Sequence, residues 1–548
     1  MNGLMMDVPL LITDLIRFAD RNHGDTEIVS KTAEGAGKDG TGAVHRTTYR
    51  EAHARARRLA KVLQALGVKA GDRIGTLAWN GYRHYELYYA ISGIGAVINT
   101  INPRLFPDQI SYISNHAENQ ALFFDLTFVP LVEKLAPQLK TVKHFVLMTD
   151  RAHMPAQTSI PKLLCYEELM DQQDDRFEWP SFDERTAAAL CYTSGTTGNP
   201  KGVLYGHRST VLHAYGAALP DALNLGARDV VLPVVPMFHA NAWSLPYACT
   251  MVGAKMVFPG PHLDGKSVYE LIEQEKVTLS AGVPTVWLML LQHLAAQKVK
   301  FTTLKRTVIG GSACPPAMIR TFQDDYGVQV FHAWGMTEMS PLGTVGSLKA
   351  KQAALPKEER IAVQAKQGRG IFGVEMKIVD EQGKELPWDG KRFGNLLVKG
   401  PWIASGYLKG EGGDPLQEGW FPTGDVGTID PEGYLQITDR SKDVIKSGGE
   451  WISSIDLENI AVAHPAVQEA AVIGVAHPKW DERPIVVAVK KAGQALTREE
   501  LLKFYEGKIA KWWMPDDVVF VKELPHTATG KLSKLTLRQQ MREYKFPS

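Results

Sequence analysis

Short apolar runs alternate with helical patterns through most of the first four hundred residues. The apolar runs span residues 73–78, 95–102, 121–124, 144–148, 230–235 and 255–258. Helical stretches such as residues 49–66 lie between them. Strands that alternate with helices pair in parallel, because each helix returns the chain to the same end of the sheet. The pattern therefore predicts an α/β fold whose large N-terminal part is built from layered α/β subdomains.

The pattern changes toward the C-terminus. Between residues 390 and 434, glycines and short β-rich runs predict a small β-rich subdomain, either a twisted sheet or a barrel. After residue 439, short strands at 470–475, 484–489 and 518–521 have helices between them. The charged run 439–443 is typical of an exposed junction. We therefore predict an N-terminal domain over residues 1–439, a junction at 440–442 and a smaller α+β domain over 443–548.

Composition excludes several function classes. Lys and Arg number 61 and Asp and Glu 60, so bulk attraction to nucleic acid or to an anionic membrane is not expected. No apolar run approaches the roughly 18 residues of a membrane span, and the apolar N-terminus lacks the basic region of a signal peptide. The cysteines are Cys165, Cys191, Cys249 and Cys314. Their spacing predicts neither disulfides nor a zinc site, and a cytoplasmic location follows.

The stretch YTSGTTGNPKGV at residues 192–203 has the chemistry of a phosphate-binding loop. Its glycines let the backbone turn N–H groups toward an anion, and Lys201 adds positive charge. Its hydroxyl donors are Thr193, Ser194, Thr196 and Thr197. It has no Walker register. The alternative, a plain linker, does not explain the apolar run 187–190 before it or the Pro-Lys-Gly exit.

A second constellation is HAWGMTE, from His332 to Glu338, at an expected strand end and turn. A Trp can stack on a purine, a Thr can bond a phosphate oxygen, and a Glu can supply a hard oxygen to magnesium. Gly311, a little earlier, would let a flat base approach the backbone. A core Trp beside a surface Glu explains the same residues equally well.

Four further groups are ambiguous when taken alone. Asp425 follows Gly424 and is either a turn residue or a ribose ligand, with Arg440 as its partner. Lys531 lies on a loop of small residues. A single loop lysine is normally exposed to solvent, and the alternative is a catalytic role. His239 and Trp243 are four residues apart, and on a helix this spacing would put them on one face. That face would either pack in the core or line a pocket for an apolar ligand. The G-x-G-x-x-G match at residues 368–373 lacks a preceding strand, so we interpret it as a turn.

Taken together, these motifs resemble the adenylate-forming superfamily of acyl-CoA synthetases, firefly-type luciferases and peptide-synthetase adenylation domains. They occur in the family order: YTSGTTGNPKGV from Tyr192, WGMTE from Trp334, TGD from Thr423, DRSKDVIKSGGEW from Asp439 and TATGK ending at Lys531. PMFHANAW from Pro236 and KSGGEWIS from Lys446 are most similar to bacterial medium- and long-chain fatty acyl-CoA ligases. That branch also includes enzymes for thioether acids such as 3-methylmercaptopropionate.

The resemblance implies an ATP- and Mg²⁺-dependent acid–CoA ligase. Such enzymes join a carboxylate to ATP, release pyrophosphate, hold the acyl-adenylate and then transfer the acyl group to coenzyme A with release of AMP. We expect a medium- or long-chain fatty acid, with a short thioether acid as the alternative. A carrier-protein thiol as acceptor and a non-catalytic nucleotide-binding regulator are the rival functions. No carrier domain follows Ser548, which disfavours a multimodular synthetase. The resemblance also allows a homodimer.

The resemblance further assigns roles in the first half-reaction. Thr193 and Glu338 would hold magnesium, and Thr337 would bond the α-phosphate. Trp334 would stack on adenine, where relatives usually have Tyr or Phe. Asp425 and Arg440 would bind ribose. The other ATP- and AMP-binding residues would be Ser194, Gly195, Thr196, Thr197, Gly198, Lys201, Gly311, Ser312, His332, Ala333, Gly335 and Met336.

The remaining roles belong to the acyl and CoA sites. Lys531 would stabilise the charge that develops as the carboxylate attacks the α-phosphate. Lys442 would be the hinge about which a mobile C-terminal domain swings. The acyl pocket would be lined by His239, Trp243 and Gly335, with Trp243 as its gate. The pantetheine tunnel would be formed by Lys446, Ser447, Gly448, Gly449 and Trp451.

Overall fold

The computed structural model describes residues 1, 3–34, 43–193, 199–447, 450–526, 532–542, 544 and 546. Its chain divides into two compact units, each described by itself below. Unit 1 holds Met1–Thr193, Pro200–Val374 and Gly400–Pro415, and unit 2 holds Glu375–Lys399 and Leu416–Ser548. The predicted domain boundaries at 439 and 443 stay a prediction.

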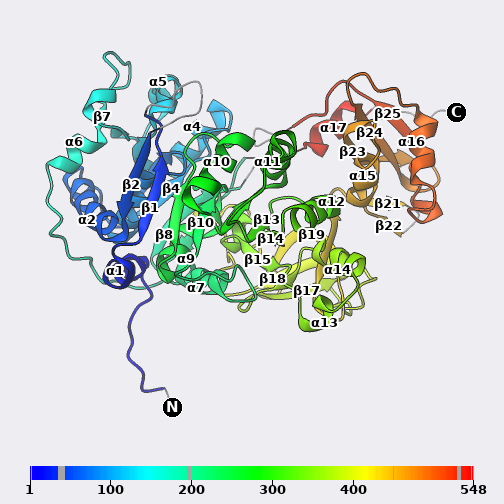
Figure 1. Cartoon of the computed structure of the whole chain (residues 1–548), viewed down its shortest axis with the longest axis horizontal. Coiled ribbons are helices and arrows are strands. Elements are labelled where there is room, and N and C mark those ends of the chain that lie inside the picture. Colours follow the sequence, from blue (N-terminus) through cyan, green and yellow to red (C-terminus); the bar gives the residue numbers. More distant parts are fainter. Residues whose placement is uncertain are drawn as a thin grey trace. The chain divides into compact units, whose positions relative to one another are not determined.

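Unit 1 contains a seven-stranded sheet in the order β7-β6-β5-β3-β4-β8-β9. Figure 1 labels β4, β7 and β8 of this sheet. All neighbouring strands are parallel except β8 and β9, which form an antiparallel pair. The strands are β3 (Arg73–Leu77), β4 (Val97–Thr100), β5 (Asn119–Phe124), β6 (His144–Leu147), β7 (Leu164–Cys165), β8 (Ala187–Tyr192) and β9 (Gly202–Gly206).

A nine-stranded sheet in the order β16-β15-β14-β13-β12-β10-β11-β1-β2 forms the other half of unit 1. Its middle is parallel, and β2, β15 and β16 add antiparallel edges. The strands are β1 (Glu27–Lys31), β2 (Val44–Thr48), β10 (Val230–Pro233), β11 (Lys255–Phe258), β12 (Leu279–Gly282), β13 (Arg306–Ile309), β14 (Gln329–Gly335), β15 (Leu342–Val345) and β16 (Arg369–Gly370).

Helices pack between the two sheets and on their outer faces. One buried core joins residues of both sheets to α1 (Ile12–His23), α2 (Tyr49–Ala65), α3 (Tyr82–Gly93), α7 (His207–Ala218) and α9 (Leu245–Val252). Every residue of α3 is buried, as expected of a helix enclosed on all sides. Thr48 and Glu51 form a capping box that starts α2. These layers confirm the predicted α/β class.

Other helices cover the face of each sheet that points away from this shared core. The remaining helices are α4 (Pro107–His116), α5 (Val129–Leu135), α6 (Tyr166–Asp171), α8 (Ala240–Trp243), α10 (Gly265–Glu275), α11 (Pro284–Gln297), α12 (Pro316–Arg320), α13 (Ala350–Ala353) and α14 (Lys357–Gln364). α4 and α5 pack on the seven-stranded sheet, and α10, α11 and α12 pack on the nine-stranded sheet. Short 3-10 and π turns are η1 (Leu126–Phe128), η2 (Ala136–Gln138), η3 (Arg151–His153), η4 (Thr321–Asp325), η5 (Thr337–Met339), η6 (Leu408–Gly410) and η7 (Lys511–Trp513).

Unit 2 contains two smaller sheets. The four-stranded antiparallel sheet is β17 (Glu375–Val379), β18 (Gly394–Lys399), β19 (Phe421–Ile429) and β20 (Leu435–Arg440). The five-stranded sheet comprises β21 (Ile445–Ser447), β22 (Glu450–Ile452), β23 (Val467–His477), β24 (Asp481–Lys490) and β25 (Asp517–Phe520). Helices α15 (Ser454–Val462) and α16 (Arg498–Tyr505) cover one face, and α17 (Lys534–Gln540) covers the other. The predicted small β-rich part and the α+β part are both present.

Two predictions from composition can be compared with the structure. All four cysteines are buried and unpaired. In the part of the chain that the structure describes, no helix is long and apolar enough to cross a membrane. Within the apolar N-terminal segment, helix α1 buries Ile12, Leu15, Ile16 and Ala19 in the core.

Candidate active site

The phosphate-loop motif begins at the end of β8, which contains the apolar run 187–190. Tyr192 and Gly202 are partners in the antiparallel β8–β9 pair, so the motif connects two neighbouring strands. Thr193 N–H donates to the Lys201 carbonyl over 2.9 Å, and Lys201 N–H donates to Thr193 Oγ1 over 3.1 Å. These bonds hold Thr193 and Lys201 opposite each other at the base of the loop. Ser194, Gly195, Thr196, Thr197 and Gly198 lie outside the described residues.

Glu338 lies in the short turn η5 that follows β14. The side chain of this residue is buried, and its Oε1 accepts a hydrogen bond of 2.8 Å from the Tyr407 hydroxyl. Its backbone carbonyl accepts from Ala404 N–H over 2.7 Å, and the carbonyl of Thr337 accepts from the Tyr205 hydroxyl over 2.5 Å. Among the described residues, no Lys or Arg forms an ion pair with Glu338. The turn therefore presents a fixed carboxylate that no Lys or Arg of the described ranges neutralises.

A glycine allows the close approach that this turn needs. A Cβ on Gly335 would lie 1.9 Å from the Pro341 carbonyl oxygen, and Met336 N–H donates to that same oxygen over 3.0 Å. Any larger residue at position 335 would force the two arms of the turn apart. The strand end and turn predicted for HAWGMTE are thus confirmed.

The predicted base-binding residues lie at neighbouring strand ends. β13 and β14 are parallel with Ile309 opposite His332, which brings the segment after β13, including Gly311 and Ser312, beside β14. Cys314 N–H donates to His332 Nε2 over 3.2 Å, and His332 Nδ1 donates to the Ala365 carbonyl over 2.9 Å. Burial lowers the pKa of His332 to about 4. His332 is therefore neutral at pH 7, and both ring nitrogens bind the protein, so its part is to position the glycine segment.

Residues 233–244, which hold the acyl-pocket candidates His239 and Trp243, are named here the acyl segment. Its C-terminal part forms a left-handed turn. From Ala240 to Ser244, five consecutive residues other than glycine have φ between 42° and 65°. Such a conformation is strained for L-residues and persists only where surrounding contacts enforce it. The helical spacing argument for His239 and Trp243 therefore does not apply, because this segment is not a right-handed helix. Trp243 is still buried, and a Cβ on Gly310 would lie 3.1 Å from its indole.

Residues from α3 and the loop before it hold the acyl segment. Asn80 Nδ2 donates to the carbonyls of Pro233 and Val235, and Asn80 Oδ1 accepts from Met237 N–H over 2.6 Å. Tyr88 donates to the Met237 carbonyl over 2.5 Å. These contacts bridge about 150 positions of sequence, and motif analysis missed them. Asn80 between Trp79 and Gly81 carries only the weak signal of a turn residue.

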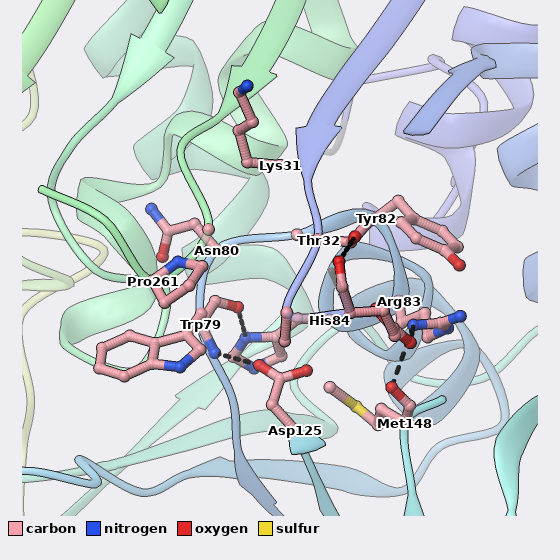
Figure 2. A pocket seen from close by; sticks show the side chains of 14 residues that line it. Lys31, Thr32, Trp79, Asn80, Tyr82, Arg83, His84, Asp125, Met148 and Pro261 are labelled. Carbon is pink, nitrogen blue, oxygen red and sulfur yellow. Dashed lines mark hydrogen bonds and ion pairs between the residues drawn. The ribbon is translucent and has the colours of Figure 1, made fainter. Parts of the chain in front are cut away.

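Asn80 also lines a small pocket (Figure 2). Its free volume of about 20 Å³ is enough for one water molecule and too small for a substrate. Figure 2 shows the Trp79 backbone clamped there: its N–H donates to Asp125 Oδ2 over 2.6 Å, and its carbonyl accepts from His84 Nδ1. The Trp79 ring packs edge-on against Phe238, so this clamp also supports the acyl segment.

Asp125 makes the stability of this region pH-dependent. Burial raises the pKa of Asp125 from 3.8 to about 7, although the Trp79 hydrogen bond acts in the opposite direction. The folded state then retains a proton that the unfolded chain has lost between about pH 4 and 7. The free energy of unfolding therefore falls as pH rises through that window, by an amount on the order of 4 kcal/mol. We expect Asp125→Asn to lack this loss. The melting temperature of the variant should therefore rise relative to that of the native protein as the pH is raised from 5 to 8. Equal pH dependence of both proteins would contradict the assignment.

In unit 2, Asp425 and Arg440 are brought together as predicted. They face each other in the β19–β20 pair, and Arg440 Nε lies 3.0 Å from the buried Asp425 Oδ1. The Arg440 guanidinium also donates to the Thr423 carbonyl over 3.1 Å. This pair therefore holds the Asp425 carboxylate in one orientation.

The hinge and tunnel candidates follow in the same unit. Burial and the nearby Arg440 charge lower the pKa of Lys442. Lys446 Nζ lies 2.5 Å from Glu381, and Ser447 Oγ accepts from Arg483 over 3.1 Å. The Trp451 ring lies below the Lys446 ammonium, 5.7 Å from it. Gly448, Gly449 and Lys531 lie outside the described residues.

Comparison with known families decides the identity of the chain. The family model for AMP-binding enzymes matches residues 17–408, and the model for the AMP-binding enzyme C-terminal domain matches residues 456–531. The chain belongs to the AMP-binding enzyme family. The predicted resemblance to adenylate-forming enzymes is thereby confirmed.

Relatives of this AMP-binding enzyme cover it from end to end. The 3-methylmercaptopropionyl-CoA ligase of Ruegeria lacuscaerulensis is 56% identical over 99% of both chains. The medium-chain-fatty-acid–CoA ligase of Ectopseudomonas oleovorans is 50% identical over 98% of this chain and 97% of its own. The crystal structure of the anthranilate CoA ligase AuaEII with anthranoyl-AMP is 25% identical, with a TM-score of 0.84 over 99% of both chains. The AMP-binding enzyme described here is therefore an ATP-dependent acyl-CoA synthetase, as predicted.

Proposed function

We propose that the acid activated by this synthetase is an aliphatic monocarboxylate with an unbranched, apolar chain. The full-length similarity to ligases named for a short thioether acid and for medium-chain fatty acids carries the proposal. The buried side chains of Phe238, Ala242 and Trp243 in the acyl segment support it, because they offer an apolar surface. A fatty acid of medium or long chain and 3-methylmercaptopropionate are the two substrates to compare.

A substrate panel tests this proposal. The purified protein is given ATP, Mg²⁺ and coenzyme A with fatty acids from butanoate to hexadecanoate, and with 3-methylmercaptopropionate. The acyl-CoA product is measured by mass spectrometry and the acids are ranked by kcat/KM. An aromatic acid as the best substrate would contradict the proposal. Adenylate without thioester would favour a carrier-protein thiol as acceptor, and no pyrophosphate release with any acid would favour a non-catalytic regulator.

The described residues fit a magnesium ion beside the phosphates. Glu338 is a buried carboxylate that no described Lys or Arg neutralises, and only one of its oxygens is held by Tyr407. Magnesium prefers hard oxygen ligands and usually binds one or two carboxylates together with phosphate oxygens. Glu338 and the Thr193 hydroxyl would hold the ion, which would neutralise charge on the phosphates. In the described part of the chain no cluster of three His, Cys, Asp or Glu residues competes for this role.

The other nucleotide contacts are proposed from the same resemblance. Thr337 would bond the α-phosphate, and Tyr205 fixes the turn that carries it. Lys201 would attract the outer phosphates, and Trp334 would stack on adenine, with Gly311 behind the base. In unit 2, the Asp425 carboxylate would accept the ribose hydroxyls, and the Arg440 ion pair would orient it. Lys531 would face the reacting carboxylate and α-phosphate.

We also propose that the two half-reactions use different arrangements of the domains. The C-terminal domain over residues 443–548 would move about the hinge at 440–442, where Lys442 lies. This movement would exchange Lys531 for the pantetheine tunnel at Lys446, Ser447, Gly448, Gly449 and Trp451. Glycines suit such a tunnel, because a narrow passage leaves little room for side chains.

The proposed gate makes a prediction for Trp243→Ala. We expect the variant to change the ratio of kcat/KM between dodecanoate and butanoate about tenfold, since removing the indole opens space beside Gly310. The KM for ATP should change little. Measurement of both constants for a series of acids checks this. A change confined to the KM for ATP would contradict the gate assignment.

We propose a location in the cytoplasm and an assembly as a homodimer. Four buried free thiols are compatible with a reducing compartment, and we propose the cytoplasm. A homodimer is proposed only from the resemblance, and light scattering of the purified protein would test it.

A further inference from the structure

One segment of unit 1 connects the two phosphate-handling parts of the site. We name residues 400–415 the Tyr407 strap. It is inserted between β18 and β19 in the sequence, yet it belongs to unit 1. At its start, Ser340 Oγ donates to the Trp402 carbonyl over 2.8 Å, and Trp402 Nε1 donates to the Leu342 carbonyl over 3.2 Å. The strap is thus fixed to the end of the turn that carries Glu338 and to the start of β15, which follows that turn.

The far end of the strap is fixed to α4 and the residues after it. Lys409 Nζ lies 2.7 Å from Glu118, and Glu411 lies 3.2 Å from His116 Nε2. The Tyr112 hydroxyl donates to Glu411 over 3.4 Å. His116 also contacts the Tyr192 hydroxyl at 2.7 Å, at the end of β8. The strap therefore runs from the Glu338 turn to the strand from which the phosphate loop leaves.

Tyr407 lies in the middle of the strap and contacts both functional groups. Its hydroxyl donates to Glu338 Oε1 over 2.8 Å, and the Lys201 ammonium lies 4.8 Å from the centre of its ring. The first contact fixes one carboxylate oxygen, and the other has no hydrogen-bond partner among the residues that the structure describes. The second is a cation–π contact, which holds the lysine without neutralising its charge.

The chemistry of Tyr407 suits this double contact. A tyrosine hydroxyl is protonated at physiological pH, so the Tyr407 hydroxyl donates its proton to the Glu338 carboxylate. A donor is what a carboxylate needs to keep its orientation before a cation arrives. A phenylalanine would keep the ring beneath Lys201 and lose only the hydroxyl. The two contacts can therefore be separated by substitution.

We propose that Tyr407 is a positioning residue that couples the phosphate-loop lysine to the metal-binding carboxylate. Its hydroxyl orients Glu338 toward the cation, and its ring orients Lys201 toward the outer phosphates. The proposal rests on the magnesium site proposed above. It concerns adenylation alone, because the supplied acyl-adenylate no longer carries the outer phosphates.

The test compares Tyr407→Phe, Tyr407→Leu and the control Tyr112→Phe. Tyr112→Phe removes a tyrosine hydroxyl that also binds a carboxylate of the strap, but leaves Glu338 untouched. Binding of Mn²⁺ to the protein with a non-hydrolysable ATP analogue is followed by electron paramagnetic resonance. We expect Tyr407→Phe to raise the Mn²⁺ dissociation constant about tenfold and to leave binding of the metal-free analogue unchanged. Tyr407→Leu should weaken both, and Tyr112→Phe should weaken neither.

Two further measurements distinguish positioning from a general packing role. Thioester formation from supplied acyl-adenylate should be within twofold of the native rate in Tyr407→Phe, while pyrophosphate exchange should need more Mg²⁺. Adding Tyr407→Phe to Glu338→Gln should cause no further loss of Mn²⁺ binding, because the hydroxyl acts through that carboxylate. Native Mn²⁺ affinity in Tyr407→Phe, or additive losses in the double variant, would overturn the proposal. Failure of the native protein to bind Mn²⁺ with the analogue would refute the magnesium site itself, and this proposal with it.

Discussion

Lys531→Ala is expected to reduce ATP–pyrophosphate exchange by about 10²–10³-fold, while thioester formation from supplied acyl-adenylate largely survives. The physical reason is that negative charge gathers between the carboxylate and the α-phosphate only in the first half-reaction. A preorganised ammonium stabilises that charge without transferring a proton. The two half-reactions are measured separately, with radiolabelled pyrophosphate and with synthetic acyl-adenylate plus coenzyme A.

An exposed lysine nine positions earlier supplies the control for this experiment. Lys522→Ala removes the same charge from an exposed position, and both half-reactions should stay at the native rate. If Lys531→Ala lowered both half-reactions equally, the lysine would be structural or would serve both steps. The two-step role assigned from the TATGK motif would then be wrong.

Glu338→Gln is expected to lower pyrophosphate exchange roughly 100-fold and to raise the Mg²⁺ concentration needed for half-maximal exchange. An amide keeps the size of the side chain and can still accept from the Tyr407 hydroxyl, but it lacks the charge that holds a divalent cation. The turn should therefore stay folded while its affinity for the cation falls. Exchange rates measured over a Mg²⁺ titration check this.

Glu411→Gln is the matched control for Glu338→Gln. Its carboxylate also accepts from a tyrosine hydroxyl and lies on the Tyr407 strap, but it faces Tyr112 and His116. We expect a native Mg²⁺ titration in this variant. An unchanged Mg²⁺ requirement in Glu338→Gln would remove Glu338 from the metal site.

Sequence alone was sufficient for features that are local. The phosphate-loop motif lies between two apolar strand sequences, and Thr193 and Lys201 meet because adjacent antiparallel strands bring the two ends of a short loop together. The strand end and turn of HAWGMTE are likewise written in contiguous residues. The order of the motifs along the chain identified the family, since each motif supplies one part of the same reaction.

Contacts between distant positions could not be predicted from these motifs. Tyr407 lies 69 positions from Glu338, and Asn80 lies 157 positions from Met237. No pattern in either segment names the other. Asn80 resembles an ordinary turn residue, and Tyr407 resembles an ordinary aromatic residue in a glycine-rich stretch. Tyr407 meets Glu338 only because the Tyr407 strap packs on the Glu338 turn. Asn80 meets Met237 only because the loop before α3 packs on the acyl segment.

The sequence by itself determined the α/β class, the reaction family and the candidate groups, because hydrophobic periodicity and short motifs are properties of neighbouring residues. The tertiary structure decided how those groups are held. Residues 240–244 contain no glycine and would locally prefer a right-handed helix, yet they form a left-handed turn. His332 is neutral and bound at both ring nitrogens because it is buried between the Cys314 and Ala365 backbones. At residues 240–244, contacts with distant segments outweigh a local backbone preference of a few kcal/mol. At His332, burial between distant segments sets the charge of the ring. Neither effect can be predicted from neighbouring residues, because both depend on the tertiary structure.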